Sequence, residues 1–323
     1  MARHTPNARE HKSVPGEGEP TGAPGASKRH ATLEKSGGEN VAILPAGLHL
    51  VATPIGNLGD MSPRALDVLG AADLVACEDT RVTGGLLAKL GVNRSERAPL
   101  VPYHEHNAEE MRPRLMARMQ AGAAVALVSD AGTPAISDPG YKLVRACIEA
   151  GIAVTGVPGA NAALLGLVLS GLPTDRFLFN GFLPAKAGAR KTALQKIAAV
   201  PASLIFYETG PRLAASLADM TEVLGNREAC VARELTKLFE EVRRGTLDEL
   251  AAAYAAGGGP KGEIVVIVAP PAEDGASAER IEDMLIGALA TMSVRDAADA
   301  VAKASGRPKR EVYTLALSLS ERP

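Results

Sequence analysis

Residues Ala124–Gly140 have the sequence A-V-A-L-V-S-D-A-G-T-P-A-I-S-D-P-G, which combines an apolar run with a polar loop. The small and β-branched residues Ala124–Val128 predict a buried strand. The Ser, Asp, Gly, Thr and Pro residues that follow favour turns and expose backbone groups. In an open α/β sheet, ligands bind outside the carboxyl ends of the strands. This loop is therefore a candidate ligand site, although an ordinary strand-to-helix connection has the same composition.

Three further polar loops follow predicted strands in the first half of the chain. The strands are Leu48–Ala52, Leu74–Cys77 and Ile152–Val157, and the loops are Thr53–Asp60, Glu78–Arg81 and Pro158–Asn161. Helical segments separate the strands, so that strand and helix alternate about four times between Leu48 and Ser170, which predicts a parallel sheet. All four loops would then open on the same edge of the sheet, where one ligand can contact several of them.

A different pattern begins near Asp175 and predicts a second, mixed α/β domain. The expected strands are Phe177–Phe182, Ser203–Tyr207, Ala229–Ala232, Glu241–Arg244 and Glu263–Val268. Near the end, two helical segments flank Ser305–Pro308 in an arrangement similar to a helix-turn-helix. We therefore expect a disordered extension (1–44), an N-terminal α/β domain (45–172), a C-terminal α/β domain (173–270) and a helical, helix-turn-helix-like tail (279–323).

Composition restricts the class of protein. Of the 323 residues 46% are hydrophobic, none is Trp, and the formal net charge is −2, which argues against a nucleic-acid binder dominated by charge. The three cysteines lie in apolar segments without C-x-x-C spacing, as in reduced proteins. No apolar stretch approaches the roughly 18 residues of a membrane helix. We expect a cytoplasmic protein that does not bind membranes.

The chemistry of the four loops narrows the ligand. None has the G-x-x-x-x-G-K-[ST] phosphate cradle, and no G-x-G-x-x-G follows the first strand, so a nucleoside triphosphate or a dinucleotide is disfavoured. The loops supply backbone groups, small residues and acids, which suit a nucleoside without phosphates or a cationic ligand. S-adenosylmethionine fits both descriptions. A metal at His104 and His106 is disfavoured because no further ligands follow at suitable spacing; a substrate-facing loop and a solvated turn stay open.

Nine segments of the chain resemble a known family. Five resemble the tetrapyrrole methylase superfamily: V-A-T-P-I-G-N-L-G-D (Val51–Asp60), A-C-E-D-T-R (Ala76–Arg81), Y-H-E-H-N (Tyr103–Asn107), V-S-D-A-G-T-P-A-I-S-D-P-G (Val128–Gly140) and V-P-G-A-N-A-A (Val157–Ala163). Four more make the chain similar to the small-subunit ribosomal RNA methyltransferase I group: G-F-L-P-A-K (Gly181–Lys186), L-I-F-Y-E (Leu204–Glu208), A-R-E-L-T-K (Ala232–Lys237) and K-G-E (Lys261–Glu263).

The resemblance implies a fold, a reaction and a cofactor site. It implies two α/β domains with S-adenosylmethionine between them, 2′-O-methylation of a cytidine ribose in the decoding region of 16S rRNA, and a homodimer. The basic residues are few, which favours the assembled 30S subunit as the substrate, although free rRNA stays open. Asn161 stands where a smaller residue is expected, and the long N-terminal extension is outside the family pattern. The implied cofactor residues are Pro54, Ser129, Asp130, Ala131, Gly132, Thr133, Pro134, Ser137, Pro158, Gly159, Ala160, Asn161, Phe206, Tyr207, Ala232, Arg233 and Gly262.

Polar residues on the predicted loops supply the catalytic candidates. A ribose hydroxyl is a poor nucleophile at neutral pH, so a general base, or a cation beside the developing alkoxide, would assist the transfer. The acid-base candidates lie at strand ends, and two lysines are candidates for stabilising negative charge; surface ion pairs are the alternative role for each. These residues are Glu78, Asp79, His104, Glu105, Lys237 and Lys261.

Two basic clusters are candidates for gripping RNA phosphates. The first is Lys186, Arg190, Lys191 and Lys196, and the second, in the tail, is Lys303, Arg307, Lys309 and Arg310; surface charge for solubility is the alternative. Two other functions stay open. One is C-methylation of a tetrapyrrole precursor, which leaves the basic tail without a role. The other is a non-catalytic RNA-binding assembly protein that keeps the nucleoside pocket for stability.

Overall fold

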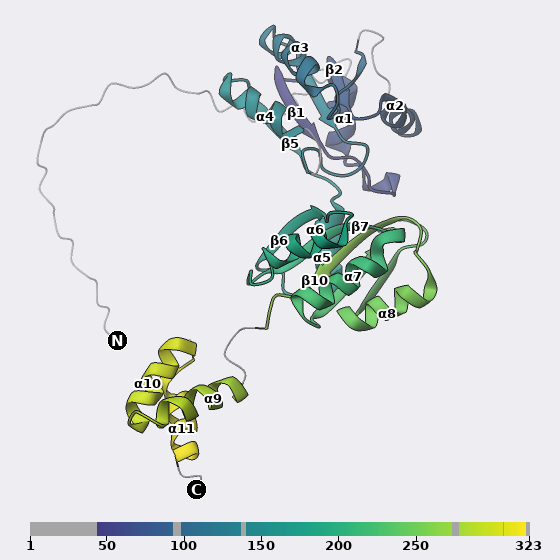
Figure 1. Cartoon of the computed structure of the whole chain (residues 1–323). Helices are drawn as coiled ribbons and strands as arrows, with labels where there is room; N and C mark the ends of the chain where they lie inside the picture. The colour runs from purple at the N-terminus through teal and green to yellow at the C-terminus, as the bar shows by residue number, and fades with distance from the viewer. Residues whose placement is uncertain (1–43, 93–97, 137–139, 273–277, 306, 321–323) are drawn as a thin grey trace, which may run out of the picture.

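The computed structural model describes residues 44–92, 98–136, 140–272, 278–305 and 307–320 (Figure 1). Residues 1–43 of the expected N-terminal extension lie outside the described residues, as does the cofactor candidate Ser137. The described chain forms two five-stranded sheets followed by three helices. These two α/β regions confirm the fold class predicted from the sequence. Among the described residues, no helix is long and apolar enough to cross a membrane.

The first sheet is parallel throughout, in the order β3-β2-β4-β1-β5. Its strands are β1 (Gly47–Val51), β2 (Leu74–Cys77), β3 (Leu100–Pro102), β4 (Ala124–Val128) and β5 (Val154–Val157). Helices α1 (Pro63–Ala71) and α2 (Thr80–Lys89) pack on one face, and α3 (Ala108–Gln120) and α4 (Gly140–Glu149) pack on the other. This alternation confirms the predicted parallel sheet. The sequence pattern does not predict β3.

The two central strands, β1 and β4, mark the point where the chain changes direction. The crossover from β1 runs through α1 to β2 over one face, and the crossover from β4 runs through α4 to β5 over the other. Such a switch point leaves a crevice at the carboxyl ends of the strands. Two backbone hydrogen bonds join the loops there, from Thr53 N to Gly132 O (2.9 Å) and from Gly132 N to Thr53 O (3.1 Å).

The second sheet is mixed, in the order β6-β7-β10-β8-β9, with β6 parallel to β7 and the other neighbours antiparallel. This arrangement confirms the mixed second domain. The strands are β6 (Phe177–Phe182), β7 (Ser203–Thr209), β8 (Glu228–Arg233), β9 (Glu241–Thr246) and β10 (Glu263–Val268). One face is covered by α6 (Ala187–Gln195), α7 (Gly210–Leu224) and α8 (Leu247–Gly257).

Helix α5 (Ala162–Ser170) covers the other face of the second sheet. Ala163 and Leu167 of this helix share a core with Ile205 and Val265 of the sheet. The chain thus reaches the second sheet before residue 172, the expected end of the N-terminal domain. We therefore propose that the boundary between the two domains lies in the loop from β5 to α5.

The last three helices have a hydrophobic core of their own. They are α9 (Ala278–Leu289), α10 (Val294–Ser305) and α11 (Lys309–Ser320), and their shared core includes Leu285, Val301 and Val312. In Figure 1 they form the yellow group at the C-terminal end of the chain. Because these helices are amphipathic and pack on one another, the tail does not need the sheets to bury its apolar side chains.

Candidate functional site

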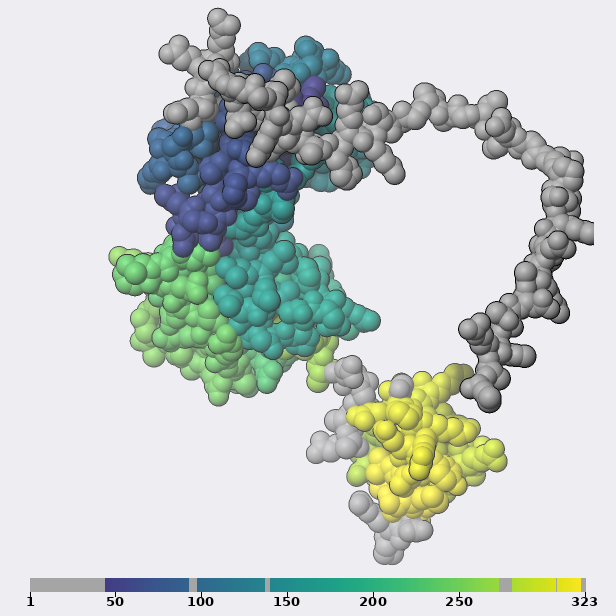
Figure 2. All heavy atoms as spheres, turned by 180° about the vertical axis from the view of Figure 1, so that it is seen from behind, coloured from purple at the N-terminus to yellow at the C-terminus, as the bar shows by residue number. Residues whose placement is uncertain are grey.

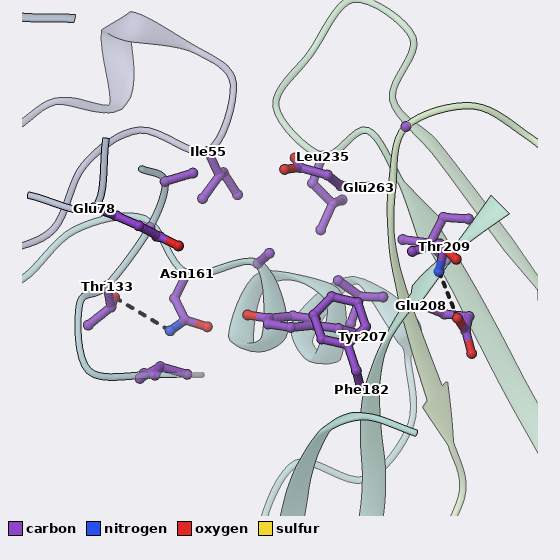
Figure 3. Close-up of a pocket in the computed structure, with 17 residues that line it drawn as sticks. Ile55, Glu78, Thr133, Asn161, Phe182, Tyr207, Glu208, Thr209, Leu235 and Glu263 are labelled. Atoms are coloured by element: carbon purple, nitrogen blue, oxygen red, sulfur yellow. Dashed lines mark hydrogen bonds between the residues drawn. The ribbon is translucent and has the colours of Figure 1, made fainter. Parts of the chain in front are cut away.

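A cavity of about 370 Å³ lies where the loops of the first sheet meet the second sheet (Figure 3). This volume lies within the range typical of small-molecule sites. The first sheet contributes Ile55, Glu78, Ala131, Gly132, Thr133, Ile136 and Asn161. The rest of the wall comes from α5 and from the second sheet with its loops: Ala162, Phe182, Tyr207, Glu208, Thr209, Leu235, Gly262, Glu263, Ile264 and Val265. Residues far apart in the sequence therefore form one concave surface.

Hydrogen bonds fix the loops after β4 and β5 to each other. The Thr133 hydroxyl donates to the Ala160 carbonyl (3.2 Å). It also accepts from Asn161 Nδ2 (3.4 Å), as Figure 3 shows. The Asn161 Oδ1 atom in turn accepts from Leu164 N (3.1 Å) and caps α5. The amide of Asn161 therefore joins two cavity-lining loops to the start of the helix.

Glu78 and Asp79 are neighbours at the end of β2 but have different surroundings. Glu78 lines the cavity, and its side chain extends into it in Figure 3. Asp79 instead caps α2 and forms an ion pair with Arg81 (2.6 Å). The hydrogen bonds from the Arg81 side chain and backbone lower the pKa of Asp79 to about 2. A carboxyl group with so low a pKa is a poor proton acceptor at neutral pH, which leaves Glu78 better suited to this role.

Aromatic rings form the floor of the cavity on the second sheet. The Tyr207 ring lies 4.9 Å from that of Phe179 and 5.6 Å from that of Phe182, measured between centroids. Burial raises the pKa of Tyr207, so that its hydroxyl is neutral at physiological pH. Figure 3 shows the rings of Tyr207 and Phe182 one beside the other below the cavity. A flat, apolar group such as an adenine ring can pack on such a surface.

The turn before β10 is built tightly around Gly262, which has φ +100°. A Cβ atom there would lie 2.3 Å from Oε1 of Glu234. The Lys237 ammonium group donates to Glu234 and to Glu263, both at 2.8 Å. Burial alone would lower the pKa of Lys237, but these two carboxylates outweigh it and raise the pKa. Lys237 therefore stays charged and is held by acids at the rim, outside the described cavity lining.

The Lys237 side chain also connects the two domains. A Cβ atom built on Gly56 would lie 2.3 Å from Cγ of Lys237, so the aliphatic stem of the lysine lies directly against that backbone. Ile55, beside Gly56, and Leu235, two residues before Lys237, both line the cavity. Figure 2 shows the purple-blue loop region of the first domain in contact with the green second domain.

His104 and Glu105 lie after β3, at the far edge of the first sheet, and neither is among the residues that line the cavity. Asn107 stands where its side chain could cap the helix that follows, but it makes no cap hydrogen bond. Its Oδ1 accepts from His104 N (2.9 Å) and its Nδ2 donates to Pro102 O (2.9 Å), so it stabilises the turn instead. No group of three His, Cys, Asp or Glu side chains that could hold a metal is found among the described residues.

The cavity gathers part of the predicted cofactor site. Ala131, Gly132, Thr133, Asn161, Tyr207 and Gly262 line it, together with the catalytic candidate Glu78. Arg233 is paired with Glu241 (3.0 Å), and Phe206 and Ala232 are fully buried in the sheet. The remaining cofactor candidates are not among the lining residues and stay predictions: Pro54, Ser129, Asp130, Pro134, Pro158, Gly159 and Ala160. The lining also includes residues that the sequence does not mark as site residues: Ile55, Ile136, Phe182, Leu235 and Glu263.

The charges of the lining explain which ligand the cavity suits. Of the 17 described residues that line it, three are glutamates and none is Lys, Arg or His. Glu208 points away from the cavity and accepts hydrogen bonds from Thr209 N (2.8 Å) and Ser216 Oγ (2.5 Å), whereas Glu78 extends into it. Such a lining disfavours phosphates and suits a positive sulfonium group beside a nucleoside.

The two basic clusters have different surroundings. Arg190 is buried and paired with Asp219 (2.5 Å), and Lys191 is paired with Glu222 (2.5 Å). These two residues hold α6 on α7, so the first cluster offers less free charge than its sequence indicates. In the tail, Lys303 and Arg310 are exposed on α10 and α11. Two tail residues are paired as well, Arg307 with Glu311 (3.7 Å) and Lys309 with Asp299 (2.5 Å), so each cluster keeps two exposed residues outside these ion pairs.

Comparisons with known proteins identify relatives of the chain. Residues 47–251 match the family model described as tetrapyrrole (corrin/porphyrin) methylases, and residues 274–320 match the model of the RsmI C-terminal HTH domain. The chain is 52% identical to the ribosomal RNA small subunit methyltransferase I of Mesorhizobium japonicum, over 86% of this chain and 94% of that protein. It is 55% identical to the protein of the same name from Erythrobacter litoralis, over 85% and 96%.

Solved structures support the fold. A diphthine synthase is similar with a TM-score of 0.52 at 15% identity, over 69% of this chain and 89% of that one. The methyltransferase CobJ is similar with a TM-score of 0.52 at 16% identity, over 70% and 94%. At these identities the likeness concerns the two α/β domains and not the substrate.

Proposed function

The chain belongs to the ribosomal RNA small subunit methyltransferase I family, and on that premise we propose that it methylates the 2′-hydroxyl of a cytidine ribose in the decoding region of 16S rRNA. It is a methyltransferase, and S-adenosylmethionine is its methyl donor. The cavity between the two domains is the observation that supports this proposal. It has carboxylates in its wall and an aromatic floor, and none of its described lining residues is basic.

The residues of the cavity suit this donor. The aromatic pair Tyr207 and Phe182 would hold the adenine ring, and the two loops that contain Thr133 and Asn161 would supply polar groups for the ribose. When bound, S-adenosylmethionine supplies a methyl group on a positively charged sulfur. The Glu78 carboxylate favours that charge and is part of the cavity wall. Glu263 also lines the cavity, but its carboxylate is paired with Lys237 (2.8 Å).

We propose Glu78 as the general base. In the transfer, a bond forms between the methyl carbon and the ribose O2′ while the bond from carbon to sulfur breaks, and the hydroxyl proton passes to a carboxylate oxygen of Glu78. The sulfur leaves as a neutral thioether. Positioning contributes most to such a displacement. The evidence for Glu78 is its place in the wall, since the other acid-base candidates are outside the described lining.

We propose the assembled 30S subunit as the substrate. The chain has a net charge of −2, and its first basic cluster is partly used in ion pairs, so the grip on free RNA phosphates would be weak. A preformed RNA shape would then supply the specificity. The tail helices would add phosphate contacts through Lys303 and Arg310.

We further propose a cytoplasmic homodimer. Helix α5 and the edge strand β6 expose apolar side chains on the same side of the second sheet, among them Leu164, Val168 and Phe177. Adjacent exposed apolar residues are typical of interfaces. Light scattering of the purified protein measures the mass and tests the dimer directly.

The experiment that tests the function is transfer of labelled methyl from S-adenosylmethionine to 30S subunits that lack the modification, to free 16S rRNA and to a tetrapyrrole precursor. We expect label in a cytidine ribose of the 30S particle, located by nuclease mapping. The Glu78→Gln variant should bind S-adenosylmethionine but transfer methyl at least about 100-fold more slowly. Label in the tetrapyrrole alone, or binding without any transfer, would contradict the proposal.

A further inference from the structure

The loop between β8 and β9, residues 234–240, exposes two neighbouring apolar side chains. Leu238 is 90% exposed and Phe239 is 68% exposed, the highest values among the large hydrophobic residues of the described chain. A single exposed apolar residue needs no explanation, but two adjacent ones at the tip of a loop indicate a contact surface. We call Leu238 and Phe239 the apolar tip.

The backbone that carries the apolar tip is held in a defined conformation. Lys237 N donates to Glu234 O (3.0 Å), Glu240 N donates to Lys237 O (3.1 Å), and Thr236 N donates to a carboxylate oxygen of Glu240 (2.7 Å). Glu234 and Thr236 have φ values of +50° and +66°, which few residues other than glycine adopt. Such strained positions concentrate at functional sites, because the surrounding contacts must maintain them.

The apolar tip lies at the rim of the cavity. Leu235, three residues before Leu238, lines the cavity, and the intervening Lys237 lies against Gly56 of the first domain. Phe239 is four residues after Leu235, and four residues of extended chain span at most about 14 Å, so a group held by Phe239 is close to the cavity entrance. The methyl acceptor must reach that same entrance.

Ion pairs hold most of the charges around the apolar tip, and the Glu240 carboxylate accepts a hydrogen bond from Thr236 N (2.7 Å). Glu241 is paired with Arg233 (3.0 Å) and Arg243 (2.5 Å), while Glu234 and Glu263 share Lys237. The basic residues Arg233, Lys237 and Arg243 are therefore held by acids and do not offer a free cation to RNA phosphates. What this surface offers is an exposed aromatic ring beside an aliphatic side chain. Bases of single-stranded RNA stack on such rings, and the stacking needs no charge.

We propose that Phe239 stacks on a base of the RNA substrate next to the methylated nucleotide, with Leu238 packed against the same base or its neighbour. This inference rests on the proposed function and adds a contact that selects an unstacked, single-stranded target. The proposal places RNA binding in two different parts of the chain. The apolar tip holds a base at the cavity, and the basic residues of the tail hold phosphates.

Steady-state methylation of unmodified 30S subunits by the full-length chain tests the proposal. Because the ring would supply the stacking surface for the base, Phe239→Ala should raise KM for the 30S subunit about ten-fold. Phe239→Tyr should keep the wild-type KM, because it keeps the ring. Titration with S-adenosylmethionine alone should give the same affinity for all variants. Ile148→Ala, at a residue 63% exposed on α4, is the matched control and should behave as wild type.

Three outcomes separate the proposal from its rivals. A wild-type KM for Phe239→Ala in an otherwise active enzyme would overturn it while leaving the proposed function intact. A lower molecular mass of Phe239→Ala in light scattering would show that the apolar tip contacts a second copy of the chain instead, and would also overturn it. If the wild-type protein methylated no RNA, the proposed function would fail first.

Discussion

Gly262 occupies a position that leaves no room for a side chain. Its φ is +100°, and a Cβ atom would lie 2.3 Å from a carboxylate oxygen of Glu234. We expect Gly262→Ala to lower the free energy of unfolding by about 1–3 kcal/mol and to weaken S-adenosylmethionine binding, because Glu234 must move and the turn that lines the cavity must deform. Urea unfolding and calorimetric titration measure the two effects.

Gly188 provides the control for Gly262. It lies in α6, no atom lies within 4 Å of the point that a Cβ atom would occupy, and its φ is not in the left-handed region. Gly188→Ala should leave cofactor binding unchanged and raise the free energy of unfolding by up to about 1 kcal/mol. Equal stability losses in the two variants would contradict the explanation from the local geometry.

At the residue scale, the sequence predicts several polar residues of the candidate site but not its apolar residues. Thr133 and Asn161 were found because they lie in polar loops that follow strands, and both line the cavity. Ile55 and Leu235 carry no such signal, because an apolar residue beside a ligand looks like a core residue. Side chains also alternate along a strand, so adjacent candidates such as Phe206 and Tyr207 lie on opposite faces of β7, and the cavity receives Tyr207.

Helix α2 depends on Asp79, whose carboxylate accepts a hydrogen bond from Arg81 N (2.8 Å) at the start of the helix. Hydrogen bonds from Arg81 lower the pKa of this group to about 2 from an ordinary value of 3.8. A lowered pKa in the folded state means that the carboxylate stabilises the fold above pH about 4 and loses this effect as the pH falls toward 2. Asp79→Asn should therefore destabilise the protein at pH 7, and the difference from wild type should shrink below pH about 4.

Urea unfolding of wild type and Asp79→Asn at several pH values between about 3 and 7 measures this dependence. Asp67→Asn, on the exposed side of α1, serves as the matched control and should show no such trend. A difference that grows with falling pH would show that the sign of the pKa shift is wrong.

At the element scale, strands with buried faces were predictable and short or uniformly apolar elements were not. The predicted strands Leu74–Cys77, Ala124–Val128 and Glu263–Val268 agree with β2, β4 and β10 residue for residue. β3 has three residues and ends in a proline, too short for a periodic pattern. α5 is apolar nearly all round, so its sequence predicts burial without indicating which sheet it covers. Its packing on the second sheet follows from the path of the chain.

At the scale of the whole molecule, the sequence indicated which loops share an edge but not what lies opposite them. The parallel order of β2, β4, β1 and β5 brings their loops together by topology alone. The opposite wall depends on how the second sheet is turned, and single contacts such as that of Lys237 with Gly56 determine this. No local pattern in the sequence describes such a contact, because its two partners are about 180 residues apart and one of them has no side chain.

Because the tail has a hydrophobic core of its own, we expect the tail to bind RNA and the cavity to bind the cofactor independently of each other. Lys303 and Arg310 lie on the tail helices, outside the cavity and its two sheets, so the Lys303→Ala/Arg310→Ala double variant should weaken binding to 30S subunits without changing affinity for S-adenosylmethionine. Each side-chain cation removed from a phosphate should reduce the salt dependence of binding, so the slope of log affinity against log salt should become less negative by about 1.5 in total. Filter binding across a range of salt concentrations measures this slope.

Lys89→Ala, at the end of α2, is the control for the double variant. It removes a positive charge from the first domain and should leave the slope unchanged. An unaltered slope in the double variant would exclude these two residues from the RNA interface, whereas a loss of cofactor affinity would show that the tail supports the cavity instead.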